Sequence, residues 1–246
     1  MRDHTLLIIC PAYNEEAFIE PLISQIKKQL NPNDEITVID DGSTDRTVEV
    51  LNKSNVKIIS HNKNYGKGMA IRTGLRYFLE TKHNYVLFMD GDGQHDPSEI
   101  HKFRDCFEKK NAEVVVASRF RTKTWRKNMP FSRKLSNLLS RLGLWALYNG
   151  FIVEDPQNGF RGYTRKVAES LIFETNGYEA ETEILINAFL KGFNFDVVPI
   201  ESIYHGHNRN SKFSLLMDTW KIPKVMFKGF FTQKPWLLRD KSRKRY

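Results

Sequence analysis

An acidic segment from Met89 to Pro97, with the sequence M-D-G-D-G-Q-H-D-P, directly follows the apolar run Tyr85–Phe88. Its carboxylates, Asp90, Asp92 and Asp96, repel one another unless a cation lies between them. Short oxygen ligands on a glycine-containing turn suit a hard cation such as Mg²⁺ or Mn²⁺, which commonly shares its coordination with phosphate oxygens. The segment therefore predicts a metal–diphosphate site, with a solvated Asp/Gly turn as the simpler alternative.

The elements that would position this segment follow a regular pattern in the first half of the chain. Short apolar runs typical of strands alternate with stretches of helical periodicity, which indicates βαβ units and a parallel sheet flanked by helices. The expected strands are Leu6–Cys10, Glu35–Asp40, Val56–Ser60, Tyr85–Asp90 and Glu113–Ser118. The expected helices are Glu15–Leu30, Thr44–Leu51, Gly68–Glu80 and Pro97–Lys109.

Three polar loops each follow one of these strands, namely Pro11–Glu15, Asp40–Asp45 and Asp90–Asp96. In a parallel sheet with helical crossovers, ligands bind beyond the carboxyl ends of the strands. We therefore expect the three loops to converge on one sheet edge and to form one site there.

The second half of the chain is less regular. Residues Arg119–Phe131 are basic and polar and predict a mobile loop, whereas Ser132–Tyr148 predicts an amphipathic helix that carries Arg133, Lys134 and Arg141. Because there is no internal repeat and no low-complexity linker, we expect one domain. The remaining expected elements are a turn-rich loop at Asp155–Tyr163 that leads to a strand, a helix at Glu179–Lys191 and a last strand at Asp196–Pro199.

The chain of 246 residues carries a formal net charge of +9. Nearly all of the excess lies in the tail, where nine lysines and arginines from Lys221 onward stand against Asp240 alone. This charge favours polyanionic partners: nucleotides, nucleic acid or an anionic membrane surface. From Phe213 onward aromatic residues interleave with the cations, which is typical of a segment in a bilayer interface. A helix packed on the domain's own core, followed by a frayed basic end, is the alternative.

The two cysteines, Cys10 and Cys106, offer no disulfide framework, which fits a reducing compartment. The opening run Thr5–Cys10 is too short for a signal-peptide core, and no stretch approaches the roughly 20 apolar residues of a spanning helix. We therefore expect a cytoplasmic protein that does not cross the membrane by itself.

Eight motifs stand in order between residues 6 and 213. They are P-A-Y-N-E (11–15), D-D-G-S-T-D (40–45), N-Y-G-K-G (64–68), D-G-D-G-Q (90–94), S-R (118–119), D-P-Q-N-G-F-R (155–161), G-Y with E-T-E (177–178 and 181–183) and S-K (211–212). With them the chain resembles the family 2 glycosyltransferases of the GT-A fold, most of all the dolichol-phosphate mannosyltransferase-like branch that attaches sugars to polyprenyl phosphates. The resemblance implies an α/β domain at 1–212, with a central, mostly parallel sheet flanked by helices, and an aromatic, basic C-terminal segment at 213–246.

The resemblance also implies roles for the residues on the nucleotide side. Asp90, Asp92 and Gln94 match the motif that holds Mg²⁺ or Mn²⁺, and such a cation neutralises charge on the departing nucleoside diphosphate. Helix capping is the alternative role for the acidic pair at 40–41, and an exposed turn position for the lysine at 67. The expected nucleotide contacts are Pro11, Tyr13, Glu15, Asp40, Asp41, Lys67 and Asp90.

On the acceptor side, the resemblance assigns phosphate contacts to Arg119, Arg133 and Asn137, although the family has a serine in place of Asn137. Guanidinium groups suit phosphate well. Arg209 and Lys212 match a basic cluster that closes over the acceptor or donor phosphate, in a stretch whose spacing departs from the family's pattern. A solvated helix face is the alternative for Arg133.

The catalytic candidates are Asp92, through the cation, and the carboxylates Asp155, Glu181 and Glu183. Inversion at the anomeric carbon is a single in-line displacement, and a hydroxyl acceptor needs a general base for it. One of the three carboxylates would then be that base, with positioning of the acceptor as the alternative role for Asp155. A phosphate acceptor is already ionised at neutral pH and needs none. For Glu181 and Glu183 a solvated helix face is the alternative.

Together these features predict an inverting, metal-dependent glycosyltransferase. It would move a hexose from a GDP- or UDP-sugar to dolichyl or undecaprenyl phosphate, as a peripheral protein at the cytoplasmic membrane face. The alternative acceptor is a glycan or a lipid-linked oligosaccharide in the assembly of surface polysaccharide or lipopolysaccharide. Nucleic acid is disfavoured because three carboxylate loops repel a polyanion, and an inactive scaffold is disfavoured because the metal carboxylates are intact.

Overall fold

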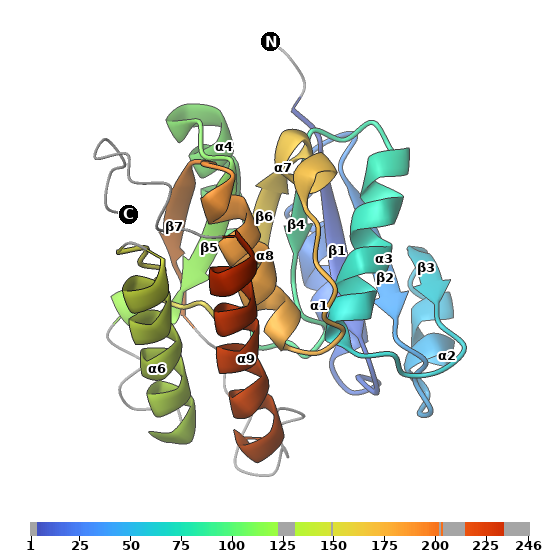
Figure 1. The fold of residues 1–246 in the computed structure, drawn as a ribbon. Coiled ribbons are helices and arrows are strands. Elements are labelled where there is room, and N and C mark those ends of the chain that lie inside the picture. The colour runs from blue at the N-terminus through green and yellow to red at the C-terminus, as the bar shows by residue number, and fades with distance from the viewer. Residues whose placement is uncertain (1–3, 123–130, 149, 202, 204–214, 234–246) are drawn as a thin grey trace.

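A computed structural model describes residues 4–122, 131–148, 150–201, 203 and 215–233 of the chain (Figure 1). Its centre is a sheet in which the described strands stand in the order β3-β2-β1-β4-β6-β5-β7. Neighbouring strands are parallel except that β6 runs antiparallel to both β4 and β5. The strands are β1 (Leu6–Ala12), β2 (Glu35–Asp40), β3 (Lys57–Ser60), β4 (Tyr85–Phe88), β5 (Val114–Ser118), β6 (Arg161–Thr164) and β7 (Phe195–Pro199).

Helices cover both faces of this sheet. In Figure 1, α3, α8 and α9 lie in front of it, with α6 beside α9. The described helices are α1 (Ile19–Lys27), α2 (Thr47–Asn52), α3 (Lys67–Glu80), α4 (Ile100–Lys110), α6 (Phe131–Leu147), α7 (Arg165–Ser170), α8 (Glu179–Leu190) and α9 (Leu215–Gln233), with 3-10 turns at Pro97–Glu99 and Arg119–Arg121.

Strand β1 shows why the central strands are apolar throughout. Side chains alternate between the two faces of a strand, so a strand covered on both faces needs apolar residues at every position. Leu7 and Ile9 pack into the core beneath α3 and α8, whereas Leu6, Ile8 and Cys10 pack into the core on the opposite face, beneath α1 and α4. The predicted α/β sheet flanked by helices is confirmed, and so are the five strands expected in the first half, within a few residues at their ends.

Strand β6 corresponds to the strand predicted after the loop at 155–163, but it begins at Arg161 and runs antiparallel to its neighbours, which the alternating pattern did not anticipate. It lies between β4 and β5, and Arg161 pairs with Phe88 of β4 and with Val116 of β5. Because β6 runs against its neighbours, its first residue lies at the edge where they end. The loop 155–160 that precedes β6 therefore arrives at the carboxyl edge of the sheet, beside the loop after β4.

Helix α9 packs on the domain. Its Ile222 and Met226 are buried in the same apolar cluster as residues of α6 and α8, and the Tyr148 hydroxyl donates to the backbone oxygen of Met226 at 2.6 Å. Helix packing, the alternative to a purely interfacial segment, thus holds for the described part of 213–246. The domain boundary at 212/213 stays a prediction. None of the described helices combines the length and the apolar character needed to span a bilayer.

Candidate active site

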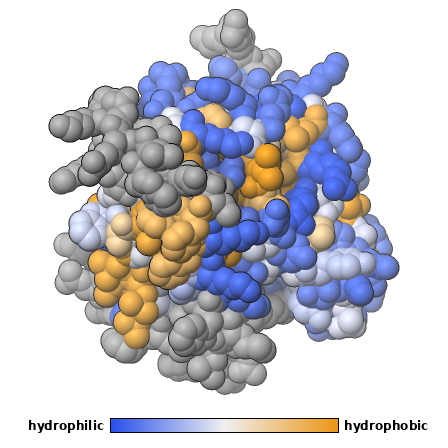
Figure 2. All heavy atoms as spheres, viewed as in Figure 1, coloured by the Kyte–Doolittle hydropathy of each residue, from blue (hydrophilic) through white to orange (hydrophobic). Residues whose placement is uncertain are grey.

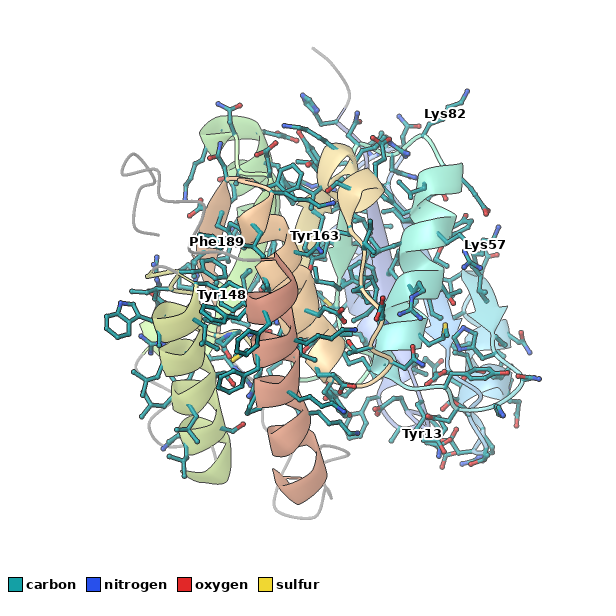
Figure 3. All side chains as sticks on the ribbon, viewed as in Figure 1. Tyr13, Lys57, Lys82, Tyr148, Tyr163 and Phe189 are labelled. Carbon is teal, nitrogen blue, oxygen red and sulfur yellow. The ribbon has the colours of Figure 1, made fainter. Side chains whose placement is uncertain are left out.

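The three polar loops meet at the carboxyl edge of the sheet, as expected. The backbone nitrogen of Asp41 donates to the oxygen of Ala12 at 2.8 Å, and that of Gly91 donates to the oxygen of Pro11 at 3.0 Å. These bonds tie the ends of β2 and β4 to the end of β1. Tyr13 lies at the lower edge of the view, where β1 and β2 end (Figure 3).

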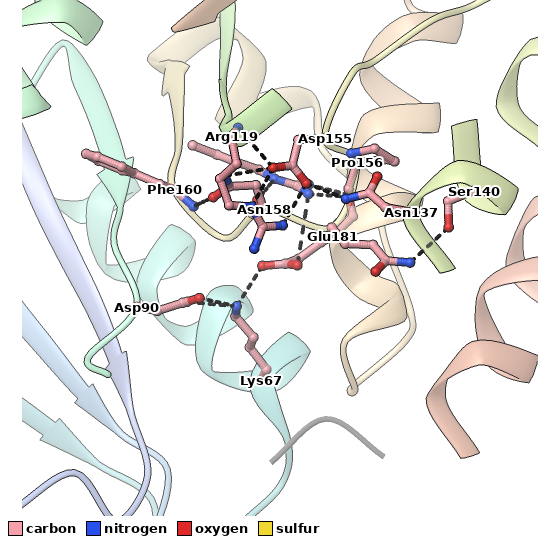
Figure 4. A network of polar contacts seen from close by, with 12 residues as sticks. Lys67, Asp90, Arg119, Asn137, Ser140, Asp155, Pro156, Asn158, Phe160 and Glu181 are labelled. Carbon is pink, nitrogen blue, oxygen red and sulfur yellow. Dashed lines mark hydrogen bonds and ion pairs between the residues drawn. The ribbon is translucent and has the colours of Figure 1, made fainter. Parts of the chain in front are cut away.

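Lys67 links this edge to α8. Its Nζ lies 2.7 Å from Asp90 Oδ1 and 2.8 Å from Glu181 Oε1, and little of any of the three side chains is exposed. Burial opposes the charge of Lys67, but the two carboxylates outweigh it and raise its pKa. Burial likewise opposes ionisation of Asp90, yet Lys67 and His95 hold its pKa below the usual value. The trio is thus an ammonium held between two carboxylates (Figure 4).

Glycines make room for this cluster. Lys67 begins α3 directly after Gly66, whose φ of +98° lies in the region that glycine favours. A Cβ on Gly66 would also lie 2.4 Å from the backbone oxygen of Asn176. At Gly159, in the loop before β6, a Cβ would lie 2.3 Å from Asp90 Oδ2. Only glycine at 159 lets that loop close against the Asp90 carboxylate.

Asp41 supports the turn before Lys67. It is buried, and its carboxylate accepts hydrogen bonds from the backbone nitrogens of Tyr65 at 3.0 Å and Gly66 at 2.8 Å. His61 Nδ1 lies 2.7 Å from the same group. Among the other expected nucleotide contacts, Asp40 Oδ1 accepts from the Ser43 nitrogen, and Glu15 is buried at the base of its loop.

Asp155 lies in a second buried cluster. Arg119 donates to it through Nε at 2.6 Å and Nη2 at 2.7 Å, one bond to each carboxylate oxygen. Asn137 of α6 donates through Nδ2 to Asp155 Oδ1 at 2.5 Å. Burial opposes ionisation of Asp155, but Arg119 and Asn137 hold its pKa below the usual range. Asp155 therefore joins the end of β5 to α6 as a carboxylate that is ionised at neutral pH.

Arg161 ties the two clusters together, although its sequence motif gave it no role. Its side chain is 2% exposed and donates to three backbone oxygens, those of Asn158 and Pro156 at 2.5 Å each and of Glu181 at 2.6 Å. One guanidinium thus fixes both the loop that carries Asp155 and the first turn of α8. The sequence carried no signal for this role, because the partners of Arg161 are backbone oxygens.

Glu183 lies apart from the Lys67 cluster. Its carboxylate accepts from the backbone nitrogens of Glu174 and Thr175 and from the Thr175 hydroxyl, at 2.6 to 3.2 Å. It therefore holds the loop before α8, whereas Glu181, two residues earlier, reaches Lys67.

The residues expected to hold a cation follow β4. Asp90 lies in the Lys67 cluster, and Asp92 Oδ1 accepts from the backbone nitrogen of Gln94 at 3.0 Å. Within the described residues no group of three or more His, Cys, Asp or Glu is placed to hold a metal. Two carboxylates and an amide oxygen nevertheless suit a hard cation that takes its other ligands from diphosphate and water. The donor set therefore fits Mg²⁺ or Mn²⁺ shared with a nucleotide.

Three expected phosphate contacts lie wholly or partly outside the described residues. Arg209 and Lys212 are among residues 204–214, and Arg133 belongs to α6 while its side chain falls outside the description. Arg119 and Asn137 are both described and both bind Asp155.

Comparison with known proteins places this site in context. The model of the family described as "Glycosyl transferase family 2" matches residues 7–172. The UDP-N-acetylglucosamine--dolichyl-phosphate N-acetylglucosaminyltransferase of Methanococcus voltae is 33% identical over 224 residues, which cover 83% of this chain and 88% of that protein. The dolichol-phosphate mannosyltransferase of Pyrococcus furiosus is 34% identical over 185 residues, which cover 73% of this chain and 51% of that protein.

Among solved structures, the chain is similar to glucosyl-3-phosphoglycerate synthase from Mycobacterium tuberculosis in complex with Mn²⁺, UDP-glucose and phosphoglyceric acid. The TM-score is 0.73 at 22% identity, over 93% of this chain and 80% of that chain. At this identity the likeness shows the fold, which is the expected GT-A fold.

Proposed function

Because this chain is a glycosyltransferase of family 2, we propose that it moves a hexose from a nucleotide sugar to a polyprenyl phosphate, with inversion and with the help of a divalent cation. The acceptor class is supported by relatives whose names specify dolichyl phosphate. The cation and the nucleotide are supported by the donor set after β4 and by a structural neighbour that binds Mn²⁺ and UDP-glucose.

The observation that carries the acceptor assignment is the pairing of the candidate bases. Glu181 is bound to Lys67 and Asp155 to Arg119, each at 2.8 Å or less. Asp155, whose pKa Arg119 holds below its usual value, is a poor proton acceptor, because its protonation would leave the buried Arg119 unpaired. The Glu181 carboxylate is already engaged by Lys67. A hydroxyl acceptor needs a base, whereas a phosphate acceptor is ionised at neutral pH. The site is thus better suited to a phosphate nucleophile.

The residues then divide into a donor side and an acceptor side. Pro11, Tyr13, Glu15 and Asp40 would line the nucleotide, with Asp41 holding the turn that presents Lys67. A divalent cation held by Asp90, Asp92 and Gln94 would neutralise the charge that develops on the leaving diphosphate. Asp155 and Arg161 position the loop 155–160, which we call the acceptor loop. We also propose that Arg133, Arg209 and Lys212 contact the phosphate of the acceptor. Arg119 and Asn137 would make a further polar contact with the acceptor.

Lys67 has a separate role at the junction of the two sides. It holds Asp90 of the donor side and Glu181 of the acceptor side with one ammonium group. It therefore fixes the distance between the two substrates, and fixed orientation of reactants lowers the barrier of a displacement. We assign Lys67 to this task and Glu183 to the support of the loop before α8.

The proposed location follows from the acceptor. A polyprenyl phosphate lies in a membrane with its phosphate at the surface, so the protein would act as a peripheral protein, on the cytoplasmic face where nucleotide sugars are made.

The test uses matched acceptors. Purified protein is incubated with UDP- and GDP-hexoses, with Mg²⁺, Mn²⁺ or EDTA, and with polyprenyl phosphate, the same polyprenol without phosphate, or a lipid-linked oligosaccharide. We expect transfer to the phosphate alone, abolished by EDTA, with a product of inverted anomeric configuration. Transfer to the oligosaccharide but to no prenyl phosphate would refute the proposed acceptor.

A further inference from the structure

Helix α6 has its apolar side turned away from the protein. Five of its side chains, between 43% and 56% exposed, form one outward stripe, while the inward positions are polar or buried. Helices of globular proteins normally bury the apolar stripe and expose the polar one. The outward side chains are Leu135, Leu138, Leu139, Leu142 and Trp145.

The inward side of α6 binds the acceptor loop. Gln157 donates through Nε2 to the hydroxyls of Ser136 and Ser140, at 2.9 Å each, and Asn137 donates to Asp155. These bonds fix which side of the helix faces the domain. The leucines face outward because the opposite, polar side of α6 is hydrogen-bonded to the loop 155–160.

Helix α9 extends the same surface. Phe227 and Phe231, one turn apart, are 52% and 67% exposed, while Met226 of α9 lies against Gly143 of α6, where a Cβ would approach its sulfur to 2.8 Å. Figure 2 shows hydrophobic side chains gathered over this part of the molecule, next to hydrophilic ones. Figure 3 shows Tyr148 between the two helices, where its hydroxyl bonds to α9. We call the outward residues of α6 and α9 the apolar panel.

Cations border the apolar panel. Helix α6 carries Lys134 and Arg141, and its sequence contains no acidic residue. On α9, Lys221 and Lys224 are exposed. An exposed apolar surface of this kind marks an interaction site. An apolar helix face rimmed by Lys and Arg suits the interface of an anionic bilayer. Two copies related by a twofold axis would bring like charges together, which disfavours self-association.

We propose that the apolar panel docks on an anionic bilayer surface and so places the acceptor loop at the level of the lipid phosphates. An α-helix with its side chains is about 10 Å across, so a bilayer on the outer side of α6 lies within one helix diameter of Gln157 and Asp155. This inference rests on the proposed function, because docking would serve to reach an acceptor that lies in a membrane. It differs from the tail prediction, because it assigns membrane contact to α6, within the domain.

The experiment measures vesicle binding separately from transfer. Three proteins are sedimented with vesicles of phosphatidylcholine, with or without phosphatidylglycerol: wild type, L138Q/L142Q and L79Q/I172Q. The last is a matched control that removes two exposed apolar side chains from other surfaces. We expect wild type and control to bind, more strongly with phosphatidylglycerol and less in high salt. We expect L138Q/L142Q to lose about tenfold or more of its partition coefficient, since two half-exposed leucine side chains no longer enter the bilayer interface. Equal binding of L138Q/L142Q and wild type overturns the proposal.

Two further measurements separate the possible failures. L138Q/L142Q should transfer sugar to a short, water-soluble prenyl phosphate as wild type does, and should lose transfer to long-chain acceptor embedded in vesicles. If wild type uses neither acceptor while its vesicle binding still depends on the leucines, the proposed function fails and the docking surface stands. If sedimentation shows a dimer that L138Q/L142Q dissociates, with vesicle binding unchanged, the apolar panel is a protein interface and the docking proposal fails.

Discussion

Asn137 and Asp155 are joined by a hydrogen bond of 2.5 Å between the amide of one and the carboxylate of the other. The bond connects α6, which carries the apolar panel, to the loop that closes on the Asp90 carboxylate through Gly159. The position of α6 and that of the acceptor loop are therefore linked by buried polar groups. Four predictions test how this site is divided between chemistry and support.

The first prediction concerns the cation. D92A should abolish transfer while thermal unfolding remains close to wild type, because the carboxylate acts on the leaving diphosphate and not in the core. The matched control is D96A in the same segment, whose carboxylate caps the turn at Pro97–Glu99 by accepting from the Ser98 nitrogen. It should keep most of the activity. Full activity in D92A would contradict the metal assignment.

The second prediction concerns the proton. If the acceptor is a phosphate, E181Q should lower kcat by about tenfold or less, since the glutamine oxygen still meets Lys67 and no base is lost. Loss of a true general base costs about 10²- to 10⁴-fold. E183Q, which weakens the anchor of the loop at 174–175, is the comparison on the same helix. A loss of 10³-fold or more in E181Q alone would identify Glu181 as the base and favour a hydroxyl acceptor.

The third prediction separates positioning from stability. R161K should lower the free energy of unfolding by about 2 kcal/mol or more, because a lysine cannot satisfy three buried carbonyls. It should also lower kcat by about tenfold or more, because the acceptor loop and Glu181 lose their common support.

Arg165 supplies the control for R161K. It likewise donates to backbone oxygens, those of Thr81 and His83 at 2.8 Å, but beyond the other end of β6. R165K should therefore lose stability and keep its kcat. If R161K and R165K lose stability alike and both keep full kcat, Arg161 has only a structural role.

The fourth prediction is a pH dependence of stability. Arg119 and Asn137 hold the pKa of Asp155 below its ordinary value of about 3.9. A carboxyl with a lowered native pKa contributes stability above the unfolded pKa, and this contribution disappears as the pH falls through the native pKa. D155N should therefore be less stable than wild type near pH 7, by about 3 kcal/mol because Arg119 stays buried without its partner.

The difference between D155N and wild type should shrink as the pH falls below about 4, as measured by urea unfolding at a series of pH values. D105N removes an exposed carboxylate paired with Lys109 and should leave the midpoint unchanged within error at every pH. A D155N deficit that stays constant down to the acid limit would show that Asp155 is not ionised in the native protein.

The convergence of the donor loops was predictable because each loop directly follows a strand whose apolar run is local in the sequence. The position of β6 was not, because its four residues pair only with strands far away in the chain and carry no alternation of their own. Arg161 was missed for the same reason: its partners are backbone oxygens, and backbone oxygens carry no sequence signal.

The apolar side of α6 was predictable, but its direction was not. Periodicity shows that a helix has one apolar side and says nothing about which side faces the domain. That direction is decided by Ser136, Asn137 and Ser140. Their partners, Gln157 and Asp155, lie 17 to 21 residues further along the chain and become neighbours only in the fold.

The reversal of β6 has a consequence for how such enzymes diversify. In an all-parallel sheet, the segment that precedes a strand lies at the amino edge of the sheet. The segments that follow the neighbouring strands lie at the carboxyl edge. Here one reversed strand delivers an incoming segment to the outgoing edge, so the continuous stretch from α6 to β6 supplies much of the proposed acceptor side. That stretch could be exchanged between relatives, giving new acceptors, while the nucleotide half of the molecule is inherited intact.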